Sequence, residues 1–322
     1  MAGAGPSAAT APQIMPAGDD DTASADGADS QWPASDLPNI DFSLDVAVPV
    51  GAELHKCRYA AMPVDRGVIA VSGAESHFTP GSHHLLAYRT DLKSIPSNQT
   101  GVWDCYSQIS GFHQRGSYYE AQQPDSHREL PNGVAHKFQP GEVILLESHY
   151  INTMSESIDA HVVLSLHTVD LDQVQQEAGT IMFNNVRLNI PPHKKTRVTM
   201  TCPITQDMNP ALLWSHMHAR GVNFVASSDD AASATELGTL YTEANWSEPQ
   251  PRIYPSNPPV TLHAGTHITF SCDYQNDTNN TFIYGQSAET NEMCILHGMY
   301  YPRMTTPGAE QCLGGTTSSM QL

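Results

Sequence analysis

The sequence is poor in positive charge. Lysine and arginine total 15 against 34 aspartates and glutamates, which gives a formal net charge of −19 with histidine neutral. Nucleic acid and anionic membrane surfaces are therefore unsuitable partners. The chain also lacks any stretch that approaches the roughly 20 apolar residues of a membrane helix, so we predict no membrane span.

Helical periodicity of useful length is absent as well. Short apolar runs rich in β-branched and aromatic residues are separated instead by proline, glycine and asparagine, which is typical of strands. The runs are residues 67–71, 84–88, 142–146, 161–166, 180–183, 197–201, 221–225 and 267–270. We predict an all-β protein of two antiparallel, jelly-roll-like β sandwiches, with at most a short helical turn at residues 231–240.

The amino-terminal segment has no lysine or arginine. Residues 1–36 consist largely of Ala, Gly, Pro, Ser, Thr and Asp. We expect this segment to be disordered, because it cannot bury enough apolar surface to offset its ordering entropy, with a functional acidic arm as the alternative. The polar stretch 171–179 divides the rest into a first domain, residues 37–175, and a second, residues 176–322.

No cysteine pair has the Cys-x-x-Cys spacing of zinc and redox motifs. The six cysteines are widely spaced: Cys57, Cys105, Cys202, Cys272, Cys294 and Cys312. An even number at such spacing favours structural disulfides and an oxidising compartment, while buried free thiols in a cytosolic protein are the alternative. Residues 1–30 do not form a signal peptide. We therefore expect a secreted, periplasmic or cell-surface protein whose leader is missing from this sequence.

The second half carries a mixed nitrogen and sulfur ligand set. His216 and His218 are two residues apart in a run that reads as a strand, so their side chains point to one face. Met293 would come from a neighbouring strand, 293–300. A thioether ligand selects copper(I) over zinc or magnesium, so these three residues predict a copper site. His297 falls on the same face as Met293 by alternation and is a further candidate.

A second candidate set consists of imidazoles alone. His83 and His84 are adjacent, and His149 follows 65 residues after His84. Adjacent residues of a regular strand point to opposite faces, so both can bind one ion only if the backbone bends there. Gly81 makes such a bend feasible. The remaining histidines have no second ligand at short spacing and are interpreted as ordinary surface or core residues: His55, His77, His113, His127, His136, His161, His167, His193, His263 and His267.

Together these motifs resemble those of the copper type II, ascorbate-dependent monooxygenases. The resemblance covers roughly residues 37–312. It rests on sequence runs that occur in the family order: His83-His84-Leu85-Leu86, Ser148-His149-Tyr150, Ala178-Gly179, Ile190-Pro191-Pro192, His216-Met217-His218, Tyr254-Pro255, Asn291-Glu292-Met293-Cys294 and Met299-Tyr300-Tyr301.

The resemblance implies two coppers per chain, one on each sandwich. His83, His84 and His149 would form an electron-donating site, and His216, His218 and Met293 the site of oxygen chemistry across an open cleft. A substrate C–H bond would be hydroxylated with O2 and electrons from ascorbate or another reductant. The family pattern also implies three disulfides, namely Cys57–Cys105, Cys202–Cys312 and Cys272–Cys294.

Several positions depart from the peptidylglycine-hydroxylating members of that family. Trp214 occupies the position of an arginine that grips the substrate carboxylate, and Ile295 and His297 replace an asparagine and a tyrosine. An indole cannot replace a guanidinium fork for a carboxylate. We therefore expect a substrate other than peptidylglycine, with Trp214 and His297 as possible pocket residues, although a tryptophan there also suits core packing. Glu147 replaces a glutamine.

Two other functions fit the sequence. One is a non-catalytic, secreted jelly-roll protein that binds copper or carbohydrate, which suits the acidic surface and the stalk-like amino terminus. The other is a mononuclear zinc or copper hydrolase that uses only three histidines. Metal content and redox response distinguish these functions from a two-copper monooxygenase.

Overall fold

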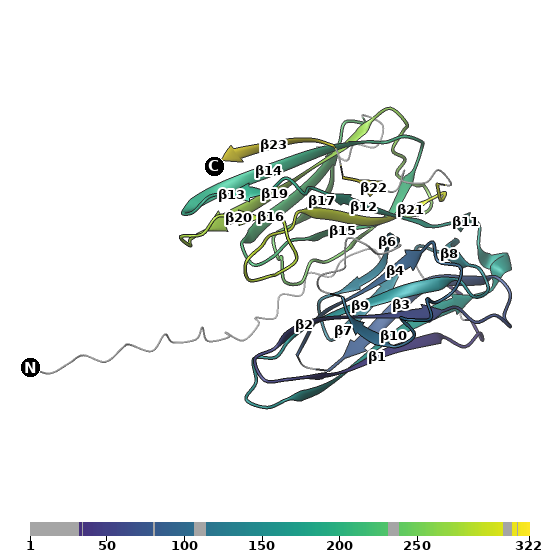
Figure 1. Cartoon of the computed structure of the whole chain (residues 1–322). Coiled ribbons are helices and arrows are strands. Elements are labelled where there is room, and N and C mark those ends of the chain that lie inside the picture. Colours follow the sequence, from purple (N-terminus) through teal and green to yellow (C-terminus); the bar gives the residue numbers. More distant parts are fainter. Residues whose placement is uncertain are drawn as a thin grey trace, which may run out of the picture.

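The computed structural model describes residues 32–33, 35–79, 81–105, 114–230, 238–304, 311–313 and 315–322, without the side chains of His83, Gln114 and Arg115. Two packed β bodies follow one another along the chain (Figure 1). Strands account for nearly all of the regular structure, so the predicted all-β class is confirmed. The jelly-roll topology stays a prediction. The proposed helical turn at 231–240 lies largely outside the described residues. Of the segment 1–36, which was predicted to be disordered, only residues 32–33 and 35–36 are described.

The described part of the first body contains ten strands in two antiparallel sheets. One sheet has the order β1-β10-β3-β8, with β7 also paired to β3, and the other has the order β5-β2-β9-β4-β6. The strands are β1 (Ile40–Val48), β2 (Glu53–Ala61), β3 (Ile69–Phe78), β4 (Ser82–Thr90), β5 (Val102–Asp104), β6 (Gln114–Ala121), β7 (Asp125–Glu129), β8 (Val134–Phe138), β9 (Val143–Ile151) and β10 (Ile158–Val169).

A short connection leads to the second body. It contains a 3₁₀ turn, Leu171–Gln173, and β11 (Gln176–Glu177), which pairs with β8. The main sheets that follow have the orders β18-β15-β21-β12-β22 and β17-β16-β19-β14-β23. The strands are β12 (Gly179–Asn184), β13 (Asn189–Ile190), β14 (Lys194–Pro203), β15 (Asn209–His216), β16 (Gly221–Ser228), β17 (Thr239–Glu243), β18 (Arg252–Ile253), β19 (His267–Asn276), β20 (Phe282–Ile283), β21 (Ile295–Tyr301), β22 (Gln311–Cys312) and β23 (Thr316–Gln321).

Alternating side chains build a core inside each body. In β10, for example, Val162, Leu164 and Leu166 are buried while the residues between them are more exposed. Each fully buried apolar side chain of this size contributes about 1.5–3 kcal/mol. The core of the second body also includes Leu130 and Val134 from the first body. The hydrophobic cluster therefore continues from one body into the other.

The two bodies also approach each other at the backbone. Gly116 of β6 has a φ of +119°, and a Cβ atom there would lie 2.1 Å from Oγ1 of Thr180 in β12. Only glycine fits a positive φ at such a close approach. Nearby, Trp32 donates a 3.0 Å hydrogen bond to the carbonyl of Leu130. The end of the amino-terminal segment thus packs on the first body.

Three disulfides tie strands together, and they are the pairs that the resemblance implied. Cys57 bonds Cys105, Cys202 bonds Cys312, and Cys272 bonds Cys294. No free cysteine is present among the described residues. The third bridge fixes the chain directly after Met293.

Candidate metal centre

His216 and His218 lie where strand β15 ends. His216 is its last residue and His218 follows in the turn, with ring centroids 5.5 Å apart. Nδ1 of His218 donates to the carbonyl of Asn291 at 3.1 Å. Nδ1 of His216 lies 2.9 Å from Oε1 of Glu120 and 2.9 Å from the side-chain amide of Gln122. These bonds place the lone pair of each ring on Nε2, as is usual for metal-binding histidines.

Met293 lies just before β21 rather than inside a strand, because β21 begins at Ile295. The expectation of a strand from 293 is therefore wrong at its first two residues. Tyr274 donates a 2.6 Å hydrogen bond to the carbonyl of Met293, and the disulfide of Cys294 anchors the next residue. The segment is fixed on both sides of the thioether.

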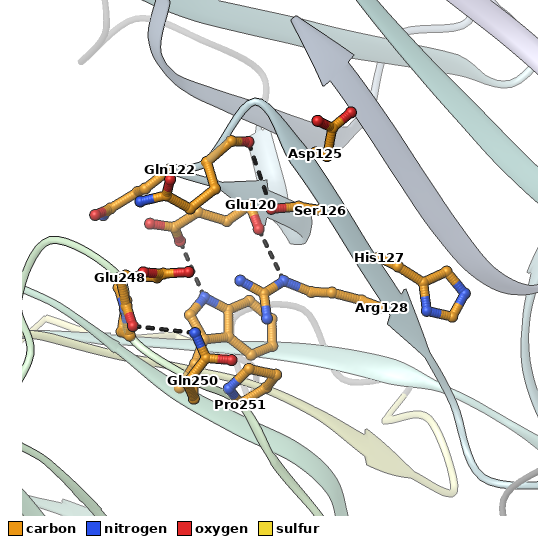
Figure 2. A pocket seen from close by; sticks show the side chains of 12 residues that line it. Glu120, Gln122, Asp125, Ser126, His127, Arg128, Glu248, Gln250 and Pro251 are labelled. Atoms are coloured by element: carbon orange, nitrogen blue, oxygen red, sulfur yellow. Dashed lines mark hydrogen bonds between the residues drawn. The ribbon is translucent and has the colours of Figure 1, made fainter. Parts of the chain in front are cut away.

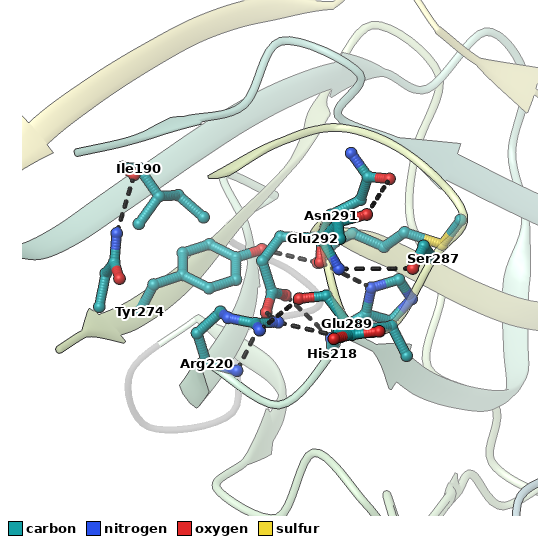
Figure 3. A network of polar contacts seen from close by, with 12 residues as sticks. Ile190, His218, Arg220, Tyr274, Ser287, Glu289, Asn291 and Glu292 are labelled. Carbon is teal, nitrogen blue, oxygen red and sulfur yellow. Dashed lines mark hydrogen bonds and ion pairs between the residues drawn. The ribbon is translucent and has the colours of Figure 1, made fainter. Parts of the chain in front are cut away.

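A buried carboxylate connects this segment to His218. Glu292 accepts 3.0 Å hydrogen bonds from the backbone N–H groups of His218 and Arg220, and the Arg220 guanidinium also reaches the carbonyls of Ala288 and Glu289 (Figure 3). Burial raises the pKa of Glu292, although these donors oppose the shift. The network sets the position of His218 relative to Met293.

The imidazoles of the first body lie in a row across three strands. His149 of β9 is in register with His55 of β2 on one side and with His84 of β4 on the other. Ring centroids of His55 and His149 are 3.9 Å apart and stacked, and those of His84 and His149 are 5.1 Å apart. Directly opposed residues share a sheet face, so the three rings converge.

His55 was missed by sequence reasoning, and the interpretation of it as an ordinary histidine is not supported by its position. No signal at short spacing could reveal it, because its partners are cross-strand. The backbone at His83 is irregular: the register shifts between Ser82 and His84, which is the bend that the adjacent pair requires. The side chain of His83 lies outside the described part of the chain, so its role as a ligand stays a prediction.

Carboxylates surround these imidazoles. Glu53 Oε1 lies 2.9 Å from Nε2 of His149, and Glu147 Oε1 lies 3.4 Å from Nδ1 of His55. Tyr88 donates to the other oxygen of Glu147 at 3.3 Å. Ligand atoms of Glu53, His55 and His149 all lie within 4.8 Å of one another, which is close enough to hold an ion. Glu147 therefore has a clear structural role as a partner of His55.

Both ligand sets open into one cavity of about 100 Å³, which we call the histidine pocket. Ring centroids of His84 and His216 are only 6.2 Å apart. The resemblance implied an open cleft between the two ligand sets, whereas in the structure the two sets lie against each other. The pocket is lined by His55, His84, Leu86, Tyr88, Glu120, Glu147, Met182, Asn184, His216, His218, Tyr284, Gln286, Met293, Ile295 and His297.

Glu120 of β6 reaches from the first body into the second. Besides His216, its carboxylate lies 3.3 Å from Nε2 of His297 and accepts a 3.1 Å hydrogen bond from the Trp214 indole. Burial alone would raise its pKa, but His297, His216 and these hydrogen bonds outweigh burial and lower it well below the usual range. Burial lowers the pKa of His297 to about 4, against the opposing effect of Glu120. Nothing in the sequence pointed to Glu120.

Trp214 lines a second cavity, and Glu120 lines both this cavity and the histidine pocket. Trp214 is fully buried and stacks on His297 with ring centroids 5.6 Å apart. The Arg128 guanidinium lies 5.2 Å above its ring, while Nε of Arg128 donates to the carbonyl of Glu120 at 2.8 Å (Figure 2). This second cavity, of about 160 Å³, also involves Glu248 and Gln250.

The donors suit copper. Two imidazoles with Nδ1 already bonded and a thioether in the same pocket form a soft N/S set, and the imidazole row provides a separate nitrogen-rich set. Each set lies beside carboxylates that orient its rings. The residues present therefore fit the metal that the resemblance implies.

No curated protein matches the sequence. The solved structure of PNGase F, a glycosylasparaginase from Flavobacterium meningosepticum, is similar over 87% of this chain and 99% of that one, at 8% identity and a TM-score of 0.36. A structure of PNGF-II is similar over 81% of this chain and 65% of that one, at 8% identity and a TM-score of 0.26. Likeness at this level carries no argument about chemistry.

A family model gives the informative match. Residues 176–318 match the model described as the copper type II ascorbate-dependent monooxygenase, C-terminal domain. The three disulfides agree with the family pattern, and no helix in the described ranges is long and apolar enough to cross a membrane. This part of the chain, which contains His216, His218 and Met293, matches the C-terminal domain of the copper type II ascorbate-dependent monooxygenases.

Proposed function

We propose that the protein is a secreted, two-copper monooxygenase that hydroxylates a C–H bond of a small organic substrate, with O2 and a one-electron donor such as ascorbate. The observation that carries the proposal is the shared histidine pocket. His216, His218 and Met293 line it from one body, and His84 lines it from the other. A single-metal hydrolase would have no use for Met293 or for a second set of imidazoles.

His216, His218 and Met293 would hold the copper of the second body. Bound there, copper supplies one-electron chemistry and O2 activation, because imidazole and thioether ligands accommodate its reduced state. The protein contributes orientation: Glu120 holds His216, and the Asn291 carbonyl holds His218. Mutation of residues that hold a metal-binding histidine in this way typically lowers metal affinity or activity 10–100-fold.

His84 and His149 would hold the copper of the first body, with His83 as the third ligand that the family pattern implies. His55 is a second candidate for that third place, since it stacks on His149 and lies 6.2 Å from His84 between ring centroids. The two copper sites would then be separated by little more than the His84–His216 contact. Such proximity shortens the path for the second electron and keeps solvent from entering between the sites.

The substrate is expected to be small, or to insert only one end into the site. The histidine pocket, of about 100 Å³, is small compared with the roughly 300–1,000 Å³ of pockets for drug-sized ligands. Its apolar wall consists of Leu86, Met182 and Ile295, which favours an apolar or aromatic reacting group. A polar end could extend toward Arg128 beyond Trp214. We therefore propose a substrate other than peptidylglycine.

The test measures copper content first and turnover second. The proposal expects two tightly bound coppers per chain and ascorbate-dependent O2 uptake with at least one member of a panel of amines, peptides and phenols. Two coppers with no uptake on any substrate would instead favour a copper-binding protein. One ion with no redox response would favour the hydrolase.

A further inference from the structure

A second cluster of metal-ligand side chains lies on the outer face of the first body, independent of the histidine pocket. Along β10, β3 and β7 every second residue points away from the core. The outward residues include His167 on β10, Glu75 on β3, and His127 and Glu129 on β7. These four side chains belong to adjacent rows of the same sheet.

A glycine creates space in the middle of the cluster. Gly73 of β3 is paired with His167 on one side and with Glu129 on the other. A Cβ atom at Gly73 would lie 2.6 Å from the carbonyl of Arg128 and 3.2 Å from Cα of Glu129. The central strand therefore has no side chain between His167 and Glu129, which can face each other across it.

The ligand atoms of the cluster already lie close to the spacing that a bound metal ion requires. His127 Nε2 lies 3.4 Å from Glu129 Oε2, and the ring centroids of His127 and His167 are 5.3 Å apart. One ligand atom from each of His127, Glu129 and His167 lies within 4.8 Å of the other two. Ligands about 2.0–2.2 Å from a tetrahedral ion are roughly 3.3–3.6 Å apart, so small rotations of the side chains suffice.

We propose that His127, His167 and Glu129 bind a divalent ion of the zinc type. Two imidazoles and a carboxylate are borderline nitrogen and oxygen donors, which suit Zn²⁺ or Cu²⁺ and, lacking sulfur, do not favour Cu(I). Glu75, whose Oε2 lies 3.7 Å from Nε2 of His167, would orient that ring. The fourth position would take water, because the cluster faces solvent.

The bound ion would cross-link two strands that do not pair directly. β7 pairs only with β3 among the described strands, and β10 lies on the other side of β3. An ion held by His127, Glu129 and His167 would join β7 to β10 over Gly73. Arg128, which stacks on Trp214, is part of β7, so the ion would also stabilise the strand that carries this guanidinium.

The test counts bound Zn²⁺ on the full chain by equilibrium dialysis at micromolar zinc. His167→Ala and His127→Ala, which alter different strands, should each bind one zinc fewer than the unaltered protein. His161→Ala is the matched control, because His161 is also an exposed histidine of β10 beside a carboxylate, Asp45, but lies outside the cluster. It should bind as much zinc as the unaltered protein.

A second measurement guards against misfolded variants. Zinc should slow amide hydrogen exchange in β7 of the unaltered protein and of His161→Ala, but not in His167→Ala. Equal zinc content in His167→Ala, His127→Ala and the unaltered protein would overturn the proposal. Loss of one zinc from His161→Ala as well would also overturn it, since binding would then be unspecific.

Discussion

The two histidine sets of the histidine pocket are built by different means. In the second body, His216 and His218 are neighbours in sequence, and their outer partners are a backbone carbonyl and a carboxylate from the other body. In the first body, His55, His149 and His84 come from three strands and meet through sheet register. A local motif defines one set and a cross-strand alignment defines the other.

The largest expected effect comes from removing one imidazole of each set. His216→Ala and His84→Ala should each lose one of two coppers and lower ascorbate-dependent O2 uptake more than about 100-fold, since losing a ligand exceeds the 10–100-fold effect of losing an outer partner. Copper analysis and oxygen-electrode rates provide the check. If His84→Ala still bound two coppers with unchanged affinity, the first body would not contain the proposed copper site.

This contrast explains which parts of the pocket could be predicted from the sequence. His216, His218 and Met293 could be predicted as a set because the two histidines are two residues apart and Met293 lies in a run that resembles the family, and the structure places all three on one pocket. Strand positions and disulfide partners also followed, because alternation and family spacing specify them. His55, Glu53 and Glu120 were not found, since their proximity depends on strand register and on the packing of two bodies, and no short-range pattern encodes either.

Met293→Ile separates binding from turnover in the second body. Isoleucine fills similar space without a sulfur ligand, so the two imidazoles should still retain copper while O2 uptake falls by about 10–100-fold. Copper content and rate are measured on the same preparation. Met154→Ile, which changes an exposed methionine that does not line the pocket, is the control and should leave the rate within a few-fold. Unchanged turnover in Met293→Ile would contradict thioether ligation.

His55→Ala sharpens the description of the first body. His55 stacks on His149, so its removal should weaken copper binding there by about 10–100-fold, while the second body keeps its copper. Competition with a copper chelator measures the change. His77→Ala, an exposed histidine of β3, serves as the comparison. If His55→Ala bound copper as tightly as the unaltered protein, His55 would not be a ligand, and His83, His84 and His149 would form the complete ligand set of the first body.

Glu120→Gln tests the carboxylate that connects the bodies. The amide keeps the shape but removes the charge that holds His216, so O2 uptake should fall by about tenfold with both coppers present. Glu248→Gln alters a carboxylate that lines the cavity next to Trp214 but does not contact the imidazoles, and should be nearly neutral. Equal effects of the two changes would mean that Glu120 acts only through general charge.

The smallest effect concerns stability at low pH. Burial and the nearby Arg89 lower the pKa of His136 from 6.5 to about 3, while its hydrogen bond to the Ala178 carbonyl opposes the shift. Because the fold favours the neutral form of His136, this residue contributes its full stabilisation of the folded state above pH 6.5. The contribution is lost as the pH falls from 6.5 toward 3. At pH 5 the loss should be about 2 kcal/mol in the free energy of unfolding.

Denaturant unfolding at pH 7 and pH 5 measures that loss. His136→Gln removes the titrating group, so its own stability should vary less between the two pH values than that of the unaltered protein. His193→Gln, which changes an exposed histidine, should keep the original pH dependence. An identical pH dependence in His136→Gln would exclude this residue as its source.

The carboxylate of Glu120 has a practical consequence for anyone who divides the chain at its connection. A fragment that starts at residue 176 would retain His216, His218 and Met293, yet the indole of Trp214 and the imidazole of His297 would lose their shared acceptor. Such a fragment would contain His216, His218 and Met293 and still lack the carboxylate beside His216. We therefore expect the two bodies to work only as a pair, because the first body supplies an acidic side chain that the site of the second body needs.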